Sequence, residues 1–239
     1  MITNGDSGSE GRSAGREVLA LVLIVPAPSI GVWAAMMALP DTVGGKSVFF
    51  LCKAWMFILP VVWLLLIDRG RLSLSRPRRG GFGAGAALGL VISAMIFLVY
   101  WLLGRHWIDD EHVRAMAVRN GIGTPVRFLA VAAYWILVNS VLEEYVYRWF
   151  IFRSFERFLP GLAAVIASAM CFTIHHVLAL KVQFDWRATV LASTGVFLGG
   201  AVWSWLYLRY RSIWPGYLSH AIVDVAVYII GWQIIFAAG

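Results

Sequence analysis

Charged residues are scarce in this sequence: Asp, Glu, Lys and Arg together make up 14% of its 239 residues. Hydrophobic residues make up 60%, and the mean hydropathy is +0.76. So little polar surface cannot coat a water-soluble globule of this size, which excludes an ordinary soluble enzyme. The composition indicates a protein whose solvent is mainly lipid.

Cysteine is almost absent, and its two occurrences, Cys52 and Cys171, lie inside apolar runs. This fits packed thiols and gives no basis for a disulfide framework or a cysteine-ligated metal. Acidic residues are outnumbered 13 to 20 by Lys and Arg, for a formal net charge of +7, but the basic residues fall in short segments between apolar runs. Because such segments act as membrane topology signals, we expect no nucleic-acid partner.

Long apolar runs are what the sequence has in abundance. Runs of roughly twenty residues, the length that crosses a bilayer, occur at 18–39, 48–67, 82–103, 128–150, 159–178, 188–207 and 213–237. Within lipid every backbone amide must be paired internally, and the sequence lacks the alternating pattern of a barrel, so these runs should be helices. The predicted fold class is all-α, a polytopic membrane helix bundle of about seven transmembrane helices.

The apolar runs divide the chain into three parts. Residues 1–17 are rich in Gly and Ser and are predicted to form a disordered cytoplasmic tail. Residues 18–127 hold the first three transmembrane helices and a loop with a short interfacial helix, which Asn120 and Gly121 should end. Residues 128–239 hold the remaining helices.

The loop between the second and third runs is rich in arginine: it contains Arg69, Arg71, Arg76, Arg78 and Arg79. The positive-inside rule places this loop in the cytoplasm. Because the number of crossings is odd, the amino terminus should then be cytoplasmic and the carboxy terminus outside. We therefore expect a multi-pass protein of the cell membrane.

Ionisable residues inside membrane spans are costly, and those that persist usually face the bundle interior and have a function. We find them in the fourth, fifth and seventh runs: Glu143, Glu144, Arg148, His175, His176, His220 and Asp224. Glu144 and Arg148 are one turn apart with the acid first, the favourable order for an ion pair. Glu143 points about 100° away around the helix, which predicts a buried carboxylate without a cationic partner, suited to act as a general base.

Helix geometry allows these residues to meet. The fourth and fifth runs are joined by a very short connection and should form an antiparallel hairpin, in which Glu143 and His176 lie within about one helical turn of each other in depth. His220 and Asp224 are one turn apart on one face, so the carboxylate can orient the imidazole. His175 is not expected to join them, because adjacent helix positions do not aim at one site.

The order and spacing of these residues resemble a family signature of three motifs: Glu143-Glu144-x-x-x-Arg148, Phe172-x-x-x-His176 and His220-x-x-x-Asp224. The signature is that of the CPBP family of intramembrane glutamic endopeptidases, also called the Abi family, which includes CAAX prenyl proteases and bacteriocin-processing enzymes. The resemblance implies that residues 128–239 form a catalytic helix bundle.

The resemblance also implies roles for individual residues. Glu143 would activate water with help from His176, and His220 and Asp224 would stabilise the oxyanion. Glu144 and Arg148 would maintain the architecture of the site. Because an ionised Asp cannot donate to an oxyanion, Asp224 would have to be protonated or to orient His220.

The expected function is intramembrane endopeptidase activity without a cofactor, on membrane-associated or C-terminally tagged substrates. Its partners would be a protein or peptide substrate and the lipid bilayer. Glu143, His176, His220 and Asp224 would also make an acceptable zinc shell, so a zinc-dependent protease is an alternative. A proton-coupled transporter and a non-catalytic immunity or scaffold protein on the same bundle also stay open.

Overall fold

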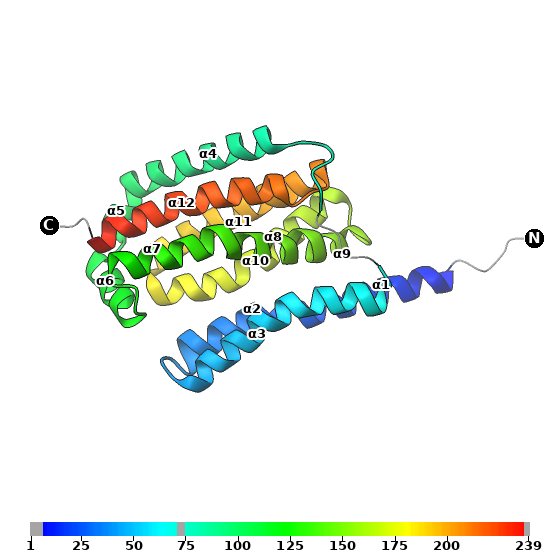
Figure 1. Cartoon of the computed structure of the whole chain (residues 1–239), viewed down its shortest axis with the longest axis horizontal. Helices are drawn as coiled ribbons and strands as arrows, with labels where there is room; N and C mark the ends of the chain where they lie inside the picture. Colours follow the sequence, from blue (N-terminus) through cyan, green and yellow to red (C-terminus); the bar gives the residue numbers. More distant parts are fainter. Residues whose placement is uncertain (1–6, 71–74, 237–239) are drawn as a thin grey trace, which may run out of the picture.

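The computed structural model of this chain describes residues 7–70 and 75–236 (Figure 1). Of these residues 86% are helical, and none lies in a strand. Seven of the described helices are long and apolar enough to cross a membrane. The predicted all-α, polytopic membrane fold is therefore confirmed. Arg71 of the arginine-rich loop lies outside the described residues, as does the last residue of the seventh apolar run.

The candidate membrane spans correspond one to one to the apolar runs of the sequence. In chain order they are Ala14–Ala38, Val43–Ile67, Phe82–Trp107, Pro125–Glu156, Gly161–Gln183, Trp186–Tyr210 and Trp214–Phe236. Their ends differ from the predicted ones by a few residues, because a helix continues past the apolar run until a cap or a turn stops it. The protein is a multi-pass membrane protein.

The spans are built from successive helical elements. The α-helices are α1 (Ser7–Ile24), α2 (Pro26–Trp33), α3 (Val43–Val62), α4 (Phe82–Val99), α5 (Arg105–Trp107), α6 (Asp110–Arg119), α7 (Pro125–Tyr134), α8 (Ser140–Glu144), α9 (Arg153–Glu156), α10 (Gly161–Gln183), α11 (Trp186–Tyr210) and α12 (Trp214–Phe236). Several spans also contain a wider, π-helical stretch: η1 (Ala34–Ala38), η2 (Trp63–Ile67), η3 (Tyr100–Gly104), η4 (Trp135–Asn139) and η5 (Tyr145–Phe152).

The first helix starts earlier than the sequence suggested. Helix α1 begins at Ser7, inside the segment 1–17 for which a disordered tail was predicted, and residues 1–6 lie outside the described residues. Glu17 is buried, and its carboxylate lies 2.6 Å from Nη1 of Arg157, just beyond the end of α9. This partner lies far away in the sequence, so composition alone gave no sign of an ordered segment here.

The short helix predicted between the third and fourth spans is present as α6. Asp109 caps its first turn, and Gly121, with φ of 75°, follows its end. The positive φ is a backbone conformation that glycine adopts without strain. Arg114 donates to the carbonyl of Ile234 at 2.8 Å, so α6 is held against the end of α12 (Figure 1).

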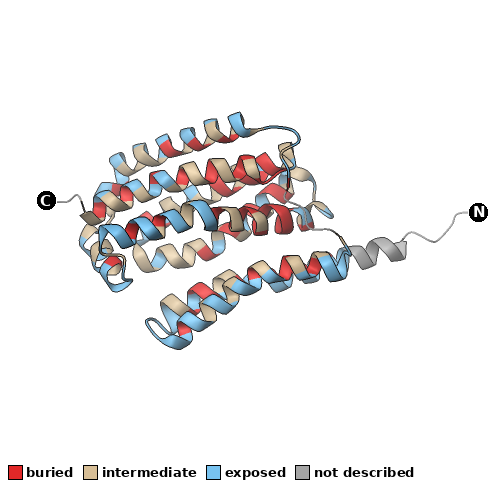
Figure 2. Ribbon diagram, in the orientation of Figure 1, coloured by how far each residue is buried: buried red, intermediate tan, exposed pale blue. Residues whose placement is uncertain are grey.

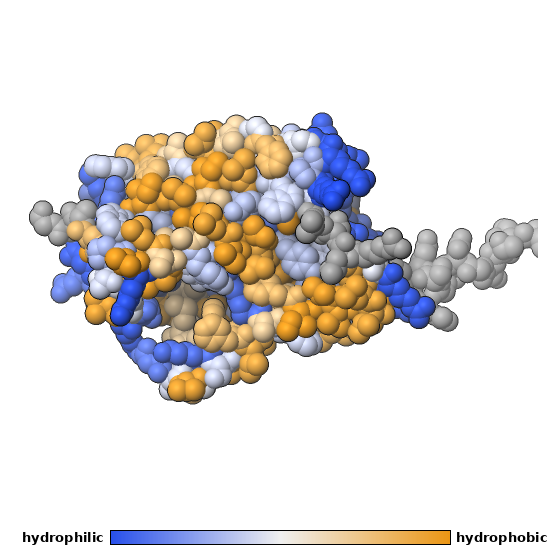
Figure 3. Space-filling model, viewed as in Figure 1, coloured by the Kyte–Doolittle hydropathy of each residue, from blue (hydrophilic) through white to orange (hydrophobic). Residues whose placement is uncertain are grey.

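The surface of the bundle is apolar, as a lipid solvent requires. Figure 3 shows hydrophobic residues over the middle of one face and hydrophilic residues gathered at its two ends. Large apolar side chains such as Phe50, Leu90 and Leu198 are exposed. Buried residues, in contrast, are concentrated on α8 and η5 (Figure 2), where both glutamates and Arg148 lie.

The amino-terminal helices lie along one flank of the bundle (Figure 1). Helices α2 and α3 pack on each other, α2 also contacts α10, and α3 contacts η5. The α2–α3 hairpin is therefore packed against the helices that carry the ionisable residues. On the opposite flank α4 runs beside α12, and Gly89 permits their close approach, since a Cβ there would lie 3.0 Å from Cα of Ser219.

Candidate active site

The two adjacent glutamates lie on α8, a stretch of 5 residues between the π-helical η4 and η5. Their side chains are buried, with 5% of Glu143 and none of Glu144 exposed. In the wide helical turn in front of them, the hydroxyl of Ser140 lies 2.8 Å from the carbonyl of Trp135 and 2.6 Å from Oδ2 of Asp224, and its single proton is shared between these two acceptors. Insertions of π-helix are frequent at functional sites because they re-aim the side chains beyond them.

Glu144 and Arg148 form the ion pair that their spacing predicts. Nη1 of Arg148 lies 3.4 Å from Oε1 of Glu144, and both side chains are fully buried. Nη2 of Arg148 donates to the carbonyl of Gly200 on α11 at 3.0 Å, and the guanidinium lies 4.8 Å from the ring centre of Phe172 on α10. Arg148 therefore links η5 to two neighbouring helices.

His220 on α12 contacts three carboxylates. Its Nδ1 lies 3.1 Å from Oε1 of Glu144, so an Nδ1–H group donates to this oxygen. Its Nε2 lies 3.8 Å from Oε2 of Glu143 and 3.8 Å from Oδ1 of Asp224. The imidazole is also stacked on Trp203, with ring centres 3.7 Å apart. These contacts fix the ring so that Nε2 faces the space beside Glu143.

The carboxylate that orients His220 differs from the one expected. The sequence pointed to Asp224, one turn away on the same helix, but Nδ1–H of His220 donates its hydrogen bond to Glu144 on α8. Oδ2 of Asp224 instead lies 2.6 Å from the hydroxyl of Ser140. Because Ser140 holds this oxygen, only Oδ1 of Asp224 faces the imidazole.

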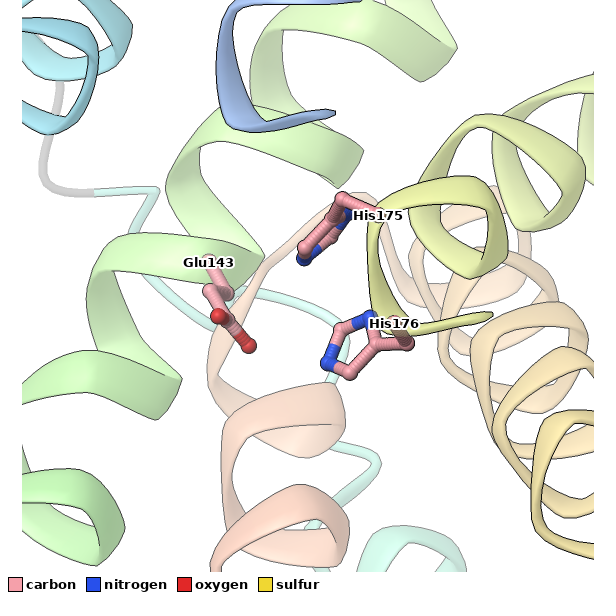
Figure 4. Close-up of side chains that lie close together, drawn as sticks. All are labelled: Glu143, His175 and His176. Atoms are coloured by element: carbon pink, nitrogen blue, oxygen red, sulfur yellow. The ribbon is translucent and has the colours of Figure 1, made fainter. Parts of the chain in front are cut away.

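His176 on α10 presents an acceptor nitrogen. Its Nδ1 lies 2.8 Å from the carbonyl of Phe172. A carbonyl only accepts, so Nδ1 carries the proton and a neutral ring keeps its lone pair on Nε2. Figure 4 shows the ring of His176 pointing toward Glu143. The structure thus brings together the acid and the imidazole that the predicted depths allowed to meet.

His175 also points toward Glu143 (Figure 4), and the expectation that it would not is wrong. Ligand atoms of Glu143, His175 and His176 all lie within 4.8 Å of one another. Two adjacent helix positions reach one site here because the carboxylate lies between the two ring directions. The hydroxyl of Tyr147, 3.1 Å from Nδ1 of His175, holds this second ring in place.

The residues that could bind a metal ion differ from the predicted set. One carboxylate and two imidazoles, from Glu143, His175 and His176, match the donors of catalytic zinc sites that keep an open position. The predicted shell had His220 and Asp224 in place of His175. Among the described residues those two fall outside the cluster, whose ligand atoms all lie within 4.8 Å of one another.

Lys53 on α3 was not predicted to belong to the site. Its ammonium group donates to Oδ1 of Asn139 at 2.6 Å and interacts electrostatically with Glu143. The carboxylate that was predicted to have no cationic partner therefore has a buried ammonium in its surroundings, although no ion pair between Lys53 and Glu143 is present among the described residues. The signal was present in the sequence, since a lysine inside the apolar run 48–67 meets the same criterion that selected the other ionisable residues.

Comparison with known families identifies part of the chain. Residues 125–226 match the family model of Rce1-like type II CAAX prenyl endopeptidases. These residues form an Rce1-like domain. The domain extends from α7 into α12 and contains all three motifs, in agreement with the CPBP resemblance. The chain has no significant match among curated proteins or among solved structures.

The match to the Rce1-like family supports the interpretation of this protein as a protease that acts within the membrane. It includes every site residue predicted from the sequence, as well as His175 and Asn139. Lys53 lies before the domain, on the α2–α3 hairpin. The site described above is thus built from the domain and from one residue of the preceding helices.

Proposed function

We propose that this protein is a glutamic-type intramembrane endopeptidase, which hydrolyses peptide bonds of membrane-associated or C-terminally tagged substrates. The observation that carries the proposal is the environment of Glu143, a buried carboxylate near His176 and 3.8 Å from Nε2 of His220. Its partners are a protein or peptide substrate and the lipid bilayer. The arginine-rich loop and the amino terminus would face the cytoplasm.

The first step is activation of water. A water molecule between Glu143 and Nε2 of His176 has an acceptor for each of its two protons, because Phe172 holds the proton of His176 on Nδ1. As the water oxygen attacks the scissile carbonyl carbon, Glu143 takes one proton as general base. His176 accepts a hydrogen bond from the remaining hydroxyl and fixes the direction of attack.

The second step is stabilisation of the oxyanion and release of the products. A protonated His220 can donate through Nε2–H to the oxyanion, since its Nδ1–H is already engaged with Glu144. When the C–N bond breaks, the proton held by Glu143 passes to the leaving amine. The carboxylic acid and the amine together account for both hydrogens of the water. Asp224, held by Ser140 and with Oδ1 3.8 Å from Nε2 of His220, would stabilise the positive charge of the protonated imidazole rather than donate to the oxyanion.

The substrate would carry its cleavage site near a C-terminus. The family that the Rce1-like domain matches is named for CAAX prenyl proteins, whose lipid would hold the peptide at the membrane. A lipid-anchored or apolar tail is also what can reach a carboxylate buried among membrane-spanning helices. We therefore propose lipid-anchored or apolar C-terminal peptides as the substrate class.

Glu143→Gln tests the proposal, because Gln keeps the shape of the side chain but cannot take a proton. In liposomes containing the full-length protein, cleavage should fall by about 10²- to 10⁴-fold, and the thermal unfolding midpoint should stay unchanged. In cells, comparative membrane peptidomics should show uncut precursors. The matched control, Glu111→Gln on the exposed surface of α6, should cut normally.

The outcomes separate the alternatives. Normal cleavage by the Glu143→Gln protein would contradict the proposal. If the wild type shows no cleavage and Glu143→Gln abolishes ion or solute flux, the protein is a transporter. If the variant changes neither flux nor cleavage, the protein is a scaffold.

A zinc-dependent protease is a second candidate, favoured by the 4.8 Å cluster of Glu143, His175 and His176. In that case Glu143 would be a ligand, and the metal would supply the activation of water. Repeating the assay with a strong chelator distinguishes the two. Cleavage that is lost with the chelator and restored by zinc supports the metal, whereas cleavage that persists supports Glu143 as the base.

A further inference from the structure

We infer that Lys53 and Asn139 form a positioning pair for the carboxylate of Glu143, so that the α2–α3 hairpin completes the active site of the Rce1-like domain. The inference rests on the proposed function, because it takes Glu143 as the general base. It assigns a role in the reaction to a residue that lies outside the matched residues 125–226.

The hydrogen bonds set the orientation of Asn139. The ammonium of Lys53 lies 2.6 Å from Oδ1 of Asn139. An ammonium only donates, so the amide oxygen has to face Lys53, and the NH₂ group has to point away from it. Glu143 follows Asn139 by one helical turn on the same face, so the NH₂ group of Asn139 is placed to donate toward its carboxylate. Lys53, Asn139 and Glu143 therefore form a chain of contacts across two helices.

The charge of Lys53 is directed at the same carboxylate. The ammonium lies 4.9 Å from the ring centre of Trp135 and 5.8 Å from that of Phe57, and these aromatic faces hold it in place. Among the ion pairs of the described residues, none includes Lys53. The carboxylate with which it interacts electrostatically is Glu143. In a low-dielectric interior such an interaction remains strong beyond contact distance.

A purely structural lysine would be expected elsewhere. Lysine in a membrane helix normally extends its ammonium toward the interface, because burying the charge is costly. Lys53 instead donates to Asn139, which is itself buried with 2% of its surface exposed. The arrangement fixes which oxygens of Glu143 face the imidazoles. A general base that is free to rotate away from its water loses rate without losing affinity for the substrate.

The test is a set of variants of the full-length protein in liposomes, with a peptide that the wild type cuts and the Glu143→Gln protein does not. Lys53→Met should lower kcat by about 10- to 100-fold and leave KM unchanged. Lys53→Arg, which restores the donor and the charge, should recover most of the activity. Lys46→Met, an exposed position on the same helix, is the matched control and should behave like the wild type.

A double-mutant cycle tests the connection through Asn139. Asn139→Ala should lower kcat to a similar extent, and the Lys53→Met, Asn139→Ala double variant should be little worse than either single one, because both act through one chain of contacts. A wild-type kcat for Lys53→Met, additive losses, or equal losses for Lys53→Met and Lys53→Arg would overturn the inference. Such an outcome would leave the proposed function intact as long as the Glu143→Gln protein is inactive on the same peptide, because that function depends on Glu143 and not on Lys53.

Discussion

The carboxylate oxygen Oε1 of Glu144 lies 3.1 Å from Nδ1 of His220, on a helix 76 residues further along the chain. The same oxygen lies 3.4 Å from Nη1 of Arg148. One buried carboxylate thus neutralises a guanidinium and orients an imidazole at the same time. Its neighbour Glu143 has neither contact at comparable length, which leaves it available to water. The two adjacent glutamates on α8 therefore have different roles because their surroundings differ: Glu144 is structural, and Glu143 is free to act on water.

This difference predicts that Glu144→Gln, unlike Glu143→Gln, affects both stability and turnover. Gln cannot neutralise Arg148, and an unpaired charge in a buried site costs about 3–5 kcal/mol. We expect the thermal unfolding midpoint, followed by tryptophan fluorescence in detergent, to fall by roughly 10 °C. The cleavage rate should fall as well, because His220 loses the carboxylate that fixes its ring. A Glu144→Gln protein as stable as the wild type would contradict this account of the ion pair.

Depth in the membrane could be predicted from the sequence because the helix rise is fixed. Counting residues from the turn after the fourth span brought Glu143 and His176 to similar levels, and the structure brings them together. Most residues of the site were identified because ionisable residues inside membrane spans usually have a function. The number of spans followed from the lipid solvent, which admits helices and excludes exposed loops.

Contacts across helices could not be predicted, because they depend on how each helix is rotated about its axis. Asp224 was the local choice to orient His220, but the distant Glu144 makes the hydrogen bond. Lys53 and Asn139 are 86 residues apart, and nothing in either segment pairs them. The π-helical segments around α8 rotate the next helical turns about the helix axis, and they leave no periodic signal in the composition.

Gly216 on α12 offers a second test of the position of Glu144. A Cβ added at Gly216 would lie 2.6 Å from Oε2 of Glu144, closer than real Cβ atoms approach an oxygen. Gly216→Ala should therefore displace the carboxylate and cost about 1–3 kcal/mol of unfolding free energy. Turnover should fall about tenfold or more, because the ring of His220 moves with it.

The matched control for Gly216→Ala is Gly195→Ala on α11, where no atom lies within 4 Å of the added Cβ. Ala is favoured over Gly in a helix by about 1 kcal/mol, so this variant should be as stable as the wild type or more so, with normal turnover. Equal effects of the two substitutions on thermal unfolding and on cleavage would show that the contact with Glu144 is unimportant.

Asp41 and Arg119 connect the turn before α3 to the end of α6. Nε of Arg119 donates to Oδ2 of Asp41 at 2.8 Å. This hydrogen bond lowers the pKa of Asp41 below its usual value of 3.8. Because the pKa is lower in the folded state, the pair stabilises the fold above the unfolded-state pKa, near 4. The stabilisation is lost as the pH falls through the lower, folded-state value.

Asp41→Asn should therefore lower the thermal unfolding midpoint slightly at pH 7 and low salt. Asn suits the site because it tolerates the left-handed backbone that Asp41 adopts, with φ of 61°. The difference from the wild type should shrink below about pH 4 and disappear at lower pH, once Asp41 is protonated in both states. Since both side chains are exposed, about 1 M salt should also remove it. A difference that stays constant from pH 7 to pH 3 would mean that the charge of Asp41 does not contribute.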